Sequence, residues 1–332
     1  MDTKHGLLFR AIPDNGKVRI VPDPIRRVKP IFPNCTVIPS DTLSELKRFA
    51  SVYFFPSRTT LPVNDIRWIV NVCADADEYH NALTALAEEF EGKNIPIFNH
   101  PKAILATRRD INAERLKDIP NLVVPKCVRF LADSPEVFEN TFRENKFEYP
   151  VLVRPARSQT GAGLVKIDHA NDWGKVHTIP WGGEKMYMTQ YVDFAGEDGV
   201  YRKFRMVYAN KQFHFRSLNE SASWLIHGGK RTAEIVEREL EMQEALSKDS
   251  EFIKMLAHIA QIVELDFWGI DLGITSQGQF LFFEANAAMS ITTNTHTPPE
   301  ILKMMDPIKI PIAKNVHIGL LSPSTWQTDY TK

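Results

Sequence analysis

The pattern of hydrophobic and polar positions predicts a chain in which strands and helices alternate. A continuous apolar run at residues 68–73 predicts a buried strand, and residues 75–90 place their apolar side chains on one helical face. Another short apolar run follows at residues 95–98. Strand, helix and strand joined by short links are typical of a parallel α/β unit. Residues 1–40 are rich in proline and basic side chains, and we expect irregular structure laid on that unit.

The middle of the chain carries mostly short strands. Strands are expected at residues 123–130, 150–155, 164–167 and 186–192. Residues 134–145 predict a helix, and residues 203–208 and 212–217 predict a hairpin. Residues 232–265 have a largely helical pattern. The chain after residue 298 is expected to form a helix and wrapping segments.

Two apolar strands near the end of this region carry three oxygen-bearing side chains. Residues 268–273 and 279–286 are separated by a polar, glycine-containing turn and predict a hairpin. Glu284 and Asn286 are two residues apart and share a face, and an antiparallel partner can bring Asp271 opposite them. Three such oxygens in apolar strands suit a hard cation such as Mg²⁺. Taken singly, each acid is more readily explained as a solvated charge at a strand end.

A glycine-rich segment joins two of the predicted strands. It consists of Ser158, Gln159, Thr160, Gly161, Ala162 and Gly163. Because it links strand to strand, it is neither a P-loop nor a dinucleotide fingerprint, whose glycines open a helix. A hairpin tip of this composition can cover phosphates with backbone N–H groups and hydroxyls. A plain two-glycine turn explains the same residues.

Basic side chains lie in and after these strands. Arg154 stands in an apolar strand just before the glycine-rich segment, where a buried cation needs an anion such as phosphate. Arg202, Lys203 and Arg205 form a dense basic cluster. Surface charge on a hairpin explains this cluster, but the apolar neighbours of Arg205 favour partial burial.

Composition places the chain among ordinary globular proteins. Its 332 residues allow two or three packed units, and its hydrophobic and charged fractions are 43% and 24%. A net charge of −1 gives no indication of nucleic acid or a membrane surface as partner. The three cysteines are far apart and form no metal-spaced pair, and no apolar run reaches the ~18 residues of a membrane span. We therefore expect a reduced, cytoplasmic protein.

In their order along the chain, these features resemble the ATP-grasp superfamily of carboxylate–amine ligases, such as glutathione synthetase and D-alanine–D-alanine ligase. The order is a Val-Leu-Val-basic-Pro strand, a Gly-rich hairpin, a hinge strand, a basic hairpin, a long helix and then Asp271…Glu284-x-Asn286. The resemblance covers roughly residues 99–300. Residues 99–110 and 201–205 further resemble a little-characterised bacterial subgroup, some members of which are fused to tetratricopeptide repeats.

The resemblance implies an α/β (α+β) fold class, with an ATP-grasp fold preceded by an N-terminal pre-ATP-grasp α/β domain. That domain would span residues 1–98 and the ATP-grasp region residues 99–332. The implied subdivisions of the second region are a small lid subdomain carrying the Gly-rich loop at 122–193, a metal-binding subdomain at 194–300 and a C-terminal wrapping segment at 301–332.

The resemblance also implies roles for single residues. Asp271, Glu284 and Asn286 would hold one or two Mg²⁺ ions, with Mn²⁺ possible, that bridge the phosphates of ATP. The hinge would consist of Gln190, Tyr191 and Val192, whose backbone would read the adenine edge. The phosphate lid would run from Ser158 to Gly163 and include Gln159, Thr160 and Gly161.

The cations would then face the phosphates. Arg154 stands where the family usually has a lysine on the α- and β-phosphates. Arg108 or Arg109 lies near another usual lysine position, where this chain has Ile111. Arg205, with Lys203 beside it, matches the basic residue that faces the γ-phosphate and the acyl intermediate. Arginine keeps the charge but has a planar, forked geometry.

The implied function is ATP-dependent ligation of a carboxylate to an amine through an acylphosphate, with Arg205 and Arg154 as catalytic residues. The substrates would be small molecules or peptides, the cofactors ATP and Mg²⁺, and the assembly a homodimer. Two alternatives remain open. One is a catalytically altered nucleotide-binding regulatory protein, and the other is another ATP-dependent phosphoryl transferase on the same fold.

Overall fold

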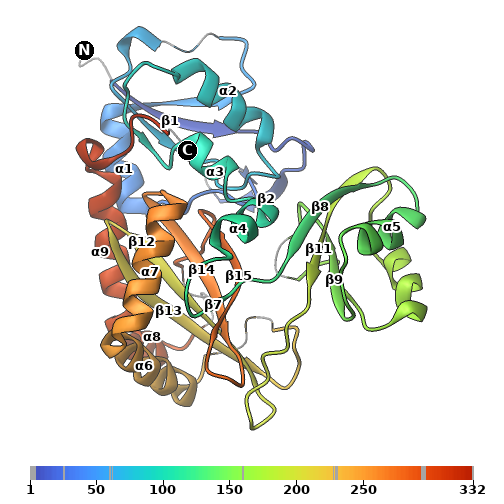
Figure 1. The fold of residues 1–332 in the computed structure, drawn as a ribbon. Coiled ribbons are helices and arrows are strands. Elements are labelled where there is room, and N and C mark those ends of the chain that lie inside the picture. Colours follow the sequence, from blue (N-terminus) through green and yellow to red (C-terminus); the bar gives the residue numbers. More distant parts are fainter. Residues whose placement is uncertain are drawn as a thin grey trace.

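The structure is a computed structural model of the chain, and it describes residues 5–24, 27–59, 61, 63–158, 161–226, 228, 231–292 and 297–330. These residues form a mixed α/β fold with a four-stranded parallel sheet, a four-stranded antiparallel sheet and a five-stranded sheet that is antiparallel except for its β15–β7 pair, which confirms the predicted class. Figure 1 shows the parallel sheet at the top, the large antiparallel sheet with its helices below it, and a smaller sheet set apart at the right. No helix among the described residues is both long and apolar enough to cross a membrane.

The first unit is a four-stranded parallel sheet in the order β4-β1-β5-β6. Its strands are β1 (Gly6–Ala11), β4 (Ala50–Phe55), β5 (Trp68–Asn71) and β6 (Ile97–Phe98). Its helices are α1 (Ser40–Phe49), the short 3-10 helix η1 (Val63–Asp65) and α2 (His80–Phe90). The expectation of irregular structure before residue 40 is wrong, because β1 is an inner strand with Leu7, Leu8 and Phe9 buried. A stretch of four mostly apolar residues is enough for an inner strand when neighbours cover both faces.

The predicted helix at residues 75–90 begins later, at His80. Asp75 causes the delay, because its Oδ1 accepts the backbone N–H groups of Asp77 and Glu78 at 2.9 Å each. A side chain that bonds nearby backbone in this way favours a turn over a helix. The turn projects the acids of residues 75–78 beyond the carboxyl end of β5.

The second unit is a four-stranded antiparallel sheet in the order β10-β9-β11-β8, which we call the lid. Its elements are β8 (Cys127–Ala132), α5 (Glu136–Glu144), β9 (Val151–Pro155), β10 (Val165–Ile167), η2 (Ala170–Thr178) and β11 (Glu184–Gln190). A separate hydrophobic cluster that includes Phe138, Val153 and Met186 fills it. The lid therefore has its own core.

The third unit is a five-stranded sheet in the order β13-β12-β14-β15-β7. Its strands are β7 (Leu122–Val123), β12 (Tyr201–Ala209), β13 (Gln212–Ser221), β14 (Phe267–Ile274) and β15 (Phe280–Asn286). The helices of this half of the chain are α3 (Pro101–Leu105), α4 (Arg109–Leu116), α6 (Ala233–Lys248), α7 (Ser250–Val263), α8 (Pro299–Met304), α9 (Asp306–Leu320) and η3 (Pro323–Thr325). β7 pairs with β15, so residues 122–123 lie in this sheet, and the exact subdomain boundaries stay a prediction.

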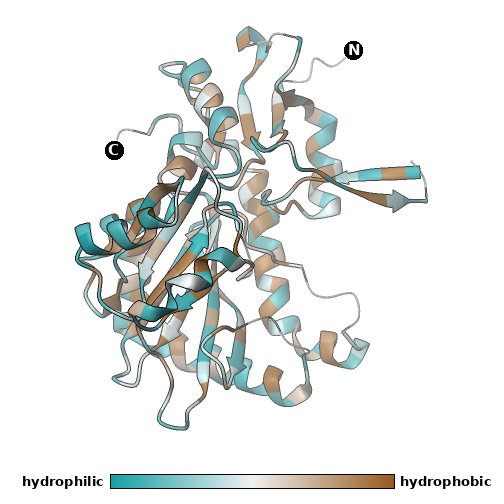
Figure 2. Cartoon of the chain, turned by 90° about the vertical axis from the view of Figure 1, so that its right-hand side faces the viewer, coloured by the Kyte–Doolittle hydropathy of each residue, from teal (hydrophilic) through white to brown (hydrophobic). Residues whose placement is uncertain are grey.

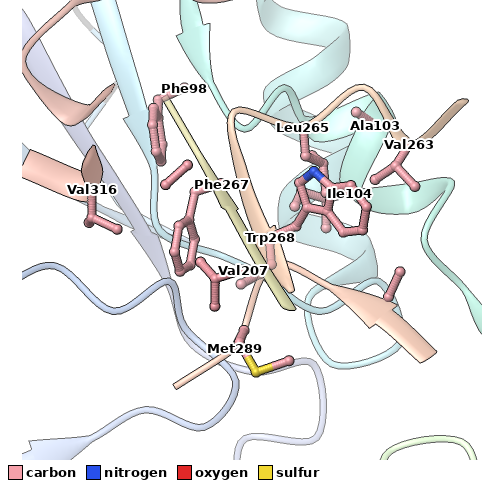
Figure 3. Packing of buried hydrophobic residues seen from close by; sticks show 14 of the residues in the cluster. Phe98, Ala103, Ile104, Val207, Val263, Leu265, Phe267, Trp268, Met289 and Val316 are labelled. Carbon is pink, nitrogen blue, oxygen red and sulfur yellow. The ribbon is translucent and has the colours of Figure 1, made fainter. Parts of the chain in front are cut away.

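The main core joins the first and third units around Trp268. Figure 3 shows Trp268 beside Ile104 and Val263, and Phe267 beside Phe98 and Val207. At Gly269, an added Cβ would lie 2.4 Å from Met289, so only glycine fits beside that side chain. The strand that carries Asp271 is thereby held tightly in place.

A two-stranded arm, formed by β2 (Arg19–Asp23) and β3 (Arg27–Ile31), is separate from all three sheets. In Figure 2 it extends sideways from the rest of the chain. At the other end of the sequence, the backbone N–H of Ile97 donates to the carbonyl of Gln327 at 2.8 Å, and Trp326 packs on Trp68 and Phe98. The last described segment therefore returns to the first sheet.

Candidate functional site

Two carboxylates face each other across the third sheet. The predicted hairpin is present, and its register pairs Asp271 with Glu284 and Gly269 with Asn286. Since residues two apart share a face, the three predicted oxygen-bearing side chains lie on one face of the sheet. The amide oxygen of Asn286 accepts the backbone N–H of Ala288 at 3.0 Å. Among the residues that the structure describes, this face included, no group of three or more His, Cys, Asp and Glu side chains is arranged to hold a metal.

Asp271 is almost fully buried and is bound by two cations from β12. Arg205 donates through Nε and Nη2 to its two oxygens at 2.9 and 3.1 Å, and the Nζ of Lys203 lies 3.1 Å from Oδ2. Arg205 is the direct register partner of Asp271, and Lys203 is two residues away on the same face. The basic hairpin predicted from sequence is therefore an inner strand whose cations point at a carboxylate.

Glu284 is held by a cation from a different element. Arg109, at the start of α4, forms an ion pair with its carboxylate. Burial opposes ionisation of Glu284, but attraction by Arg109 and by the neighbouring cations outweighs it and lowers its pKa to about 2. Those neighbours are Arg154, Lys203 and Arg205. Glu284 is thus a carboxylate at any physiological pH.

Arg154 reaches this group from the lid. It stands on β9, and burial together with the nearby Arg109 lowers its pKa to about 9. Its Nε donates to the hydroxyl of Ser158 at 3.0 Å, and its Nη2 donates to the carbonyl of Ser158. We call Lys203, Arg205, Arg109 and Arg154 the cation cradle. Four positive charges around two carboxylates leave two positive charges without a negative partner in this group, and such a site suits a polyanion.

The glycine-rich segment closes the lid hairpin next to Arg154. Gly161 and Gly163 have φ values of 74° and 66°, which glycine adopts without steric cost. An added Cβ at Gly163 would also lie 3.3 Å from Pro155. Gln159 and Thr160, predicted to belong to the phosphate lid, lie outside the described residues.

The three predicted hinge residues follow the last lid strand. The side chain of Gln190 bonds the backbone of Glu148 and Pro150, and the N–H of Tyr191 also donates to Pro150. Val192 packs with Phe194 in a small hydrophobic cluster. The N–H groups of Gln190 and Tyr191 are already bonded, so the adenine-reading role of these residues stays a prediction.

A small cavity lies where the three units meet. It is about 30 Å³ and is lined by Asp75, Asp77, Arg109, Ala156, Glu284 and Asn286, among others. A volume of about 30 Å³ holds two or three water molecules, since a water needs roughly 10–15 Å³. Asp75 and Asp77 were not among the residues predicted from sequence. Their position just beyond the carboxyl end of a buried parallel strand is the signal that could have found them.

Asp77 also connects the lid to the first unit. One of its oxygens lies 2.7 Å from Nη2 of Arg129 on β8, and the other accepts the hydroxyl of Tyr187 on β11. Its carbonyl accepts Nε of Arg157 at 2.9 Å. We call Asp77, Arg129 and Tyr187 the lid contact. It holds the lid against the first sheet and close to the cavity.

No model of a known protein family matches the sequence, and no curated protein matches it. Solved structures match in fold. VanG D-Ala:D-Ser ligase from Enterococcus faecalis is 16% identical, with 78% of this chain and 73% of that chain covered and a TM-score of 0.48. A RimK domain ATP-grasp protein from Sphaerobacter thermophilus is 11% identical, with coverage of 95% and 99% and a TM-score of 0.48. The ATP-grasp ligase PsnB, solved with a phosphomimetic variant of a minimal precursor, Mg and ADP, is 13% identical, with coverage of 97% and 99% and a TM-score of 0.47.

These matches extend over most of the chain. At such identities and TM-scores they concern the arrangement of elements.

Proposed function

We propose that this chain is an ATP-dependent carboxylate–amine ligase that works through an acylphosphate. The observation that carries the proposal is the cation cradle, which gathers cations from the lid, from α4 and from β12 around Asp271 and Glu284. Cations brought together from separate units are costly unless an anion is bound there during function. The triphosphate of ATP is such an anion.

Divalent metal fits the same face of the sheet. Mg²⁺ is held in proteins by one or two carboxylates together with substrate phosphates, and Asp271, Glu284 and Asn286 supply two carboxylates and an amide oxygen on one face. When bound, the ion would neutralise phosphate charge and orient the γ-phosphoryl group. In this structure Arg205 and Arg109 form ion pairs with the two carboxylates. When metal and ATP bind, the two arginines would turn away from the carboxylates and towards the phosphates.

The reaction transfers the γ-phosphoryl group of ATP to a substrate carboxylate. The resulting acylphosphate is attacked by an amine, the C–N bond forms, and inorganic phosphate leaves. This chemistry needs positioned charge rather than a nucleophilic side chain. Arg205 would face the transferred group, and Arg154 and Lys203 would hold the remaining phosphates. The carboxylate and amine would be small molecules or peptides.

Entry of ATP requires the lid to move, since the cavity of about 30 Å³ has room for only a few water molecules. The lid has its own core, and its contacts with the first unit include the polar lid contact. It can therefore swing as a body while its interior stays packed. Ser158, Gly161 and Gly163 would then close over the phosphates.

A nucleotide-binding protein without ligation is the second candidate. It is favoured by the complete pairing of Asp271, whose two oxygens are both bound by cations. In such a protein the paired cations would bind nucleotide while no metal reached the carboxylates.

The test is to incubate the protein with ATP, Mg²⁺ and pooled amino acids and peptides, and to follow ADP and phosphate. ADP release that depends on both a carboxylate and an amine supports the ligase, as does its loss with EDTA. Arg205→Ala should abolish turnover. Arg202→Ala is the matched control, because Arg202 lies on the opposite face of β12 and pairs with Asp198 and Glu220. Tight ATP binding without turnover across a broad substrate set would refute ligation.

A further inference from the structure

Two cysteines that are far apart in sequence lie opposite each other in the fold. Cys35 stands between β3 and α1, Cys73 follows β5, and an isolated antiparallel bridge pairs them. Residues paired in this way point to the same face, so the two side chains are neighbours. Both are free thiols in this structure. We call these two residues the cysteine pair.

The backbone hydrogen bonds on either side of the cysteine pair define its spacing. The N–H of Thr36 donates to the carbonyl of Val72 at 2.9 Å, and the N–H of Ala74 donates to the carbonyl of Asn34 at 3.2 Å. Bonds between these flanking residues are the pattern of a non-hydrogen-bonded pair, whose Cα atoms are about 4.5 Å apart. Disulfides span Cα separations of roughly 4.4–6.8 Å. The backbone is therefore already spaced for a disulfide.

The two thiols differ in their access to solvent. Cys35 is partly exposed, whereas Cys73 is only 1% exposed. Burial raises the pKa of both thiols, and more strongly that of Cys73. At Cys35 a contact of 3.4 Å with the hydroxyl of Tyr79 and the charge of Arg10 partly offset this effect on the pKa. Cys35 is therefore the thiol that a molecule from solution can reach and that ionises more readily.

The cysteine pair lies beside the turn that carries the acids of the cavity. The side-chain amide of Asn34 donates to Oδ2 of Asp75 at 3.2 Å, and the hydroxyl of Tyr79 donates to the carbonyl of Pro33. Asp75 in turn lines the cavity. A covalent bond within the pair would fasten residues 33–36 to the carboxyl end of β5 and hold this turn in place.

We propose that Cys35 and Cys73 form a reversible disulfide by exchange with a low-molecular-weight disulfide. The thiolate of Cys35 attacks one sulfur of that molecule, a mixed disulfide forms, and the other half leaves as a thiolate that takes up a proton. The thiolate of Cys73 then attacks Sγ of Cys35, the bond within the chain forms, and the second small thiol leaves in the same way. Two protein thiols are oxidised, and one small disulfide is reduced to two thiols. The proposal is independent of the ligase activity.

The test equilibrates the full-length chain with defined mixtures of reduced and oxidised glutathione, alkylates the remaining thiols and counts them by mass spectrometry. The wild type has three cysteines and should pass from three alkylated thiols to one. Peptide mapping should locate the bond between Cys35 and Cys73. At a fixed concentration of reduced glutathione, the folded chain should need at least about tenfold less oxidised glutathione than the chain in urea, because the fold already spaces the pair.

Three variants separate the two thiols. Cys73→Ala removes the second attacking thiol and should stop with one glutathione on Cys35. Cys35→Ala should stay free of glutathione, because Cys73 is buried. The matched control is Cys127→Ala in the lid, which should form the bond like the wild type.

The wild-type measurement needs no substitution, so a variant that fails to fold does not affect it. A folded wild type that keeps three free thiols at every glutathione ratio overturns the proposal. So does a bond that involves Cys127, or a transition at the same glutathione ratio in the folded and the urea-unfolded chain.

Discussion

Glu284→Gln should destabilise the protein at neutral pH by an amount that the structure sets. In the folded chain the pKa of Glu284 is about 2, against an ordinary value of 4.5. Burial alone would raise it, so the cation cradle supplies the whole of the reduction. The difference between these two pKa values corresponds to about 3 kcal/mol of stability at pH 7. The neutral amide of the glutamine variant cannot provide this stabilisation.

The sign follows from the lowered pKa. The contribution is fully present above pH 4.5 and is lost as pH falls towards 2, so the difference between wild type and variant should shrink over that window. Urea unfolding followed by the fluorescence of the six tryptophans measures it. Glu251→Gln, at an exposed pair with Lys254, is the matched control and should change little. A Glu284→Gln variant at least as stable as the wild type at pH 7 would refute the balance of charges described here.

Three further outcomes are expected. Arg154→Ala should raise the KM for ATP about tenfold to a hundredfold, the range for a lost hydrogen bond to a charged group, and an unchanged KM would remove Arg154 from the phosphate site. Burial raises the pKa of Asp266 from 3.8 to about 7, so the cost of ionising its carboxyl in the folded chain is absent below pH 3.8 and complete above about pH 7. Asp266→Asn should therefore raise Tm at pH 8 but not at pH 4. Equal effects on Tm at both pH values would contradict this. Asp77→Asn should speed hydrogen exchange in β8 and β11 by weakening the lid contact, which unchanged exchange would disprove.

The fold could be predicted where periodicity and turns act over short distances. The hairpin of β14 and β15 is one example, since two apolar runs and a polar turn predict its existence. Its register includes a β-bulge between Asp271 and Leu272, which brings Glu284 opposite Asp271. The parallel unit around β5 is another. β1 could not be predicted, because its few apolar residues stand among prolines and cations, and only pairing with β4 and β5 makes it an inner strand.

In the site, too, the residues set apart by local pattern could be predicted and those that depend on distant contacts could not. Asp271, Glu284 and Asn286 stand out because polar groups are unusual in apolar strands. The role of Asp77 could not be predicted, because its partners Arg129 and Tyr187 come from another sheet, 52 and 110 residues away in sequence. A local pattern holds no information about such a distant pairing.

The return of residues 326–327 to β6 has a consequence for how the chain completes its folding. The sheet that begins with β1 is closed at its β6 edge by residues 326 and 327, which are synthesised long after the strands of that sheet. Until they emerge, Trp68 and Phe98 lack the ring of Trp326, and the edge of β6 lacks its partner. A fragment cut at residue 98 would therefore contain every strand of the first sheet and still be unfinished, prone to pair its open edge with other chains.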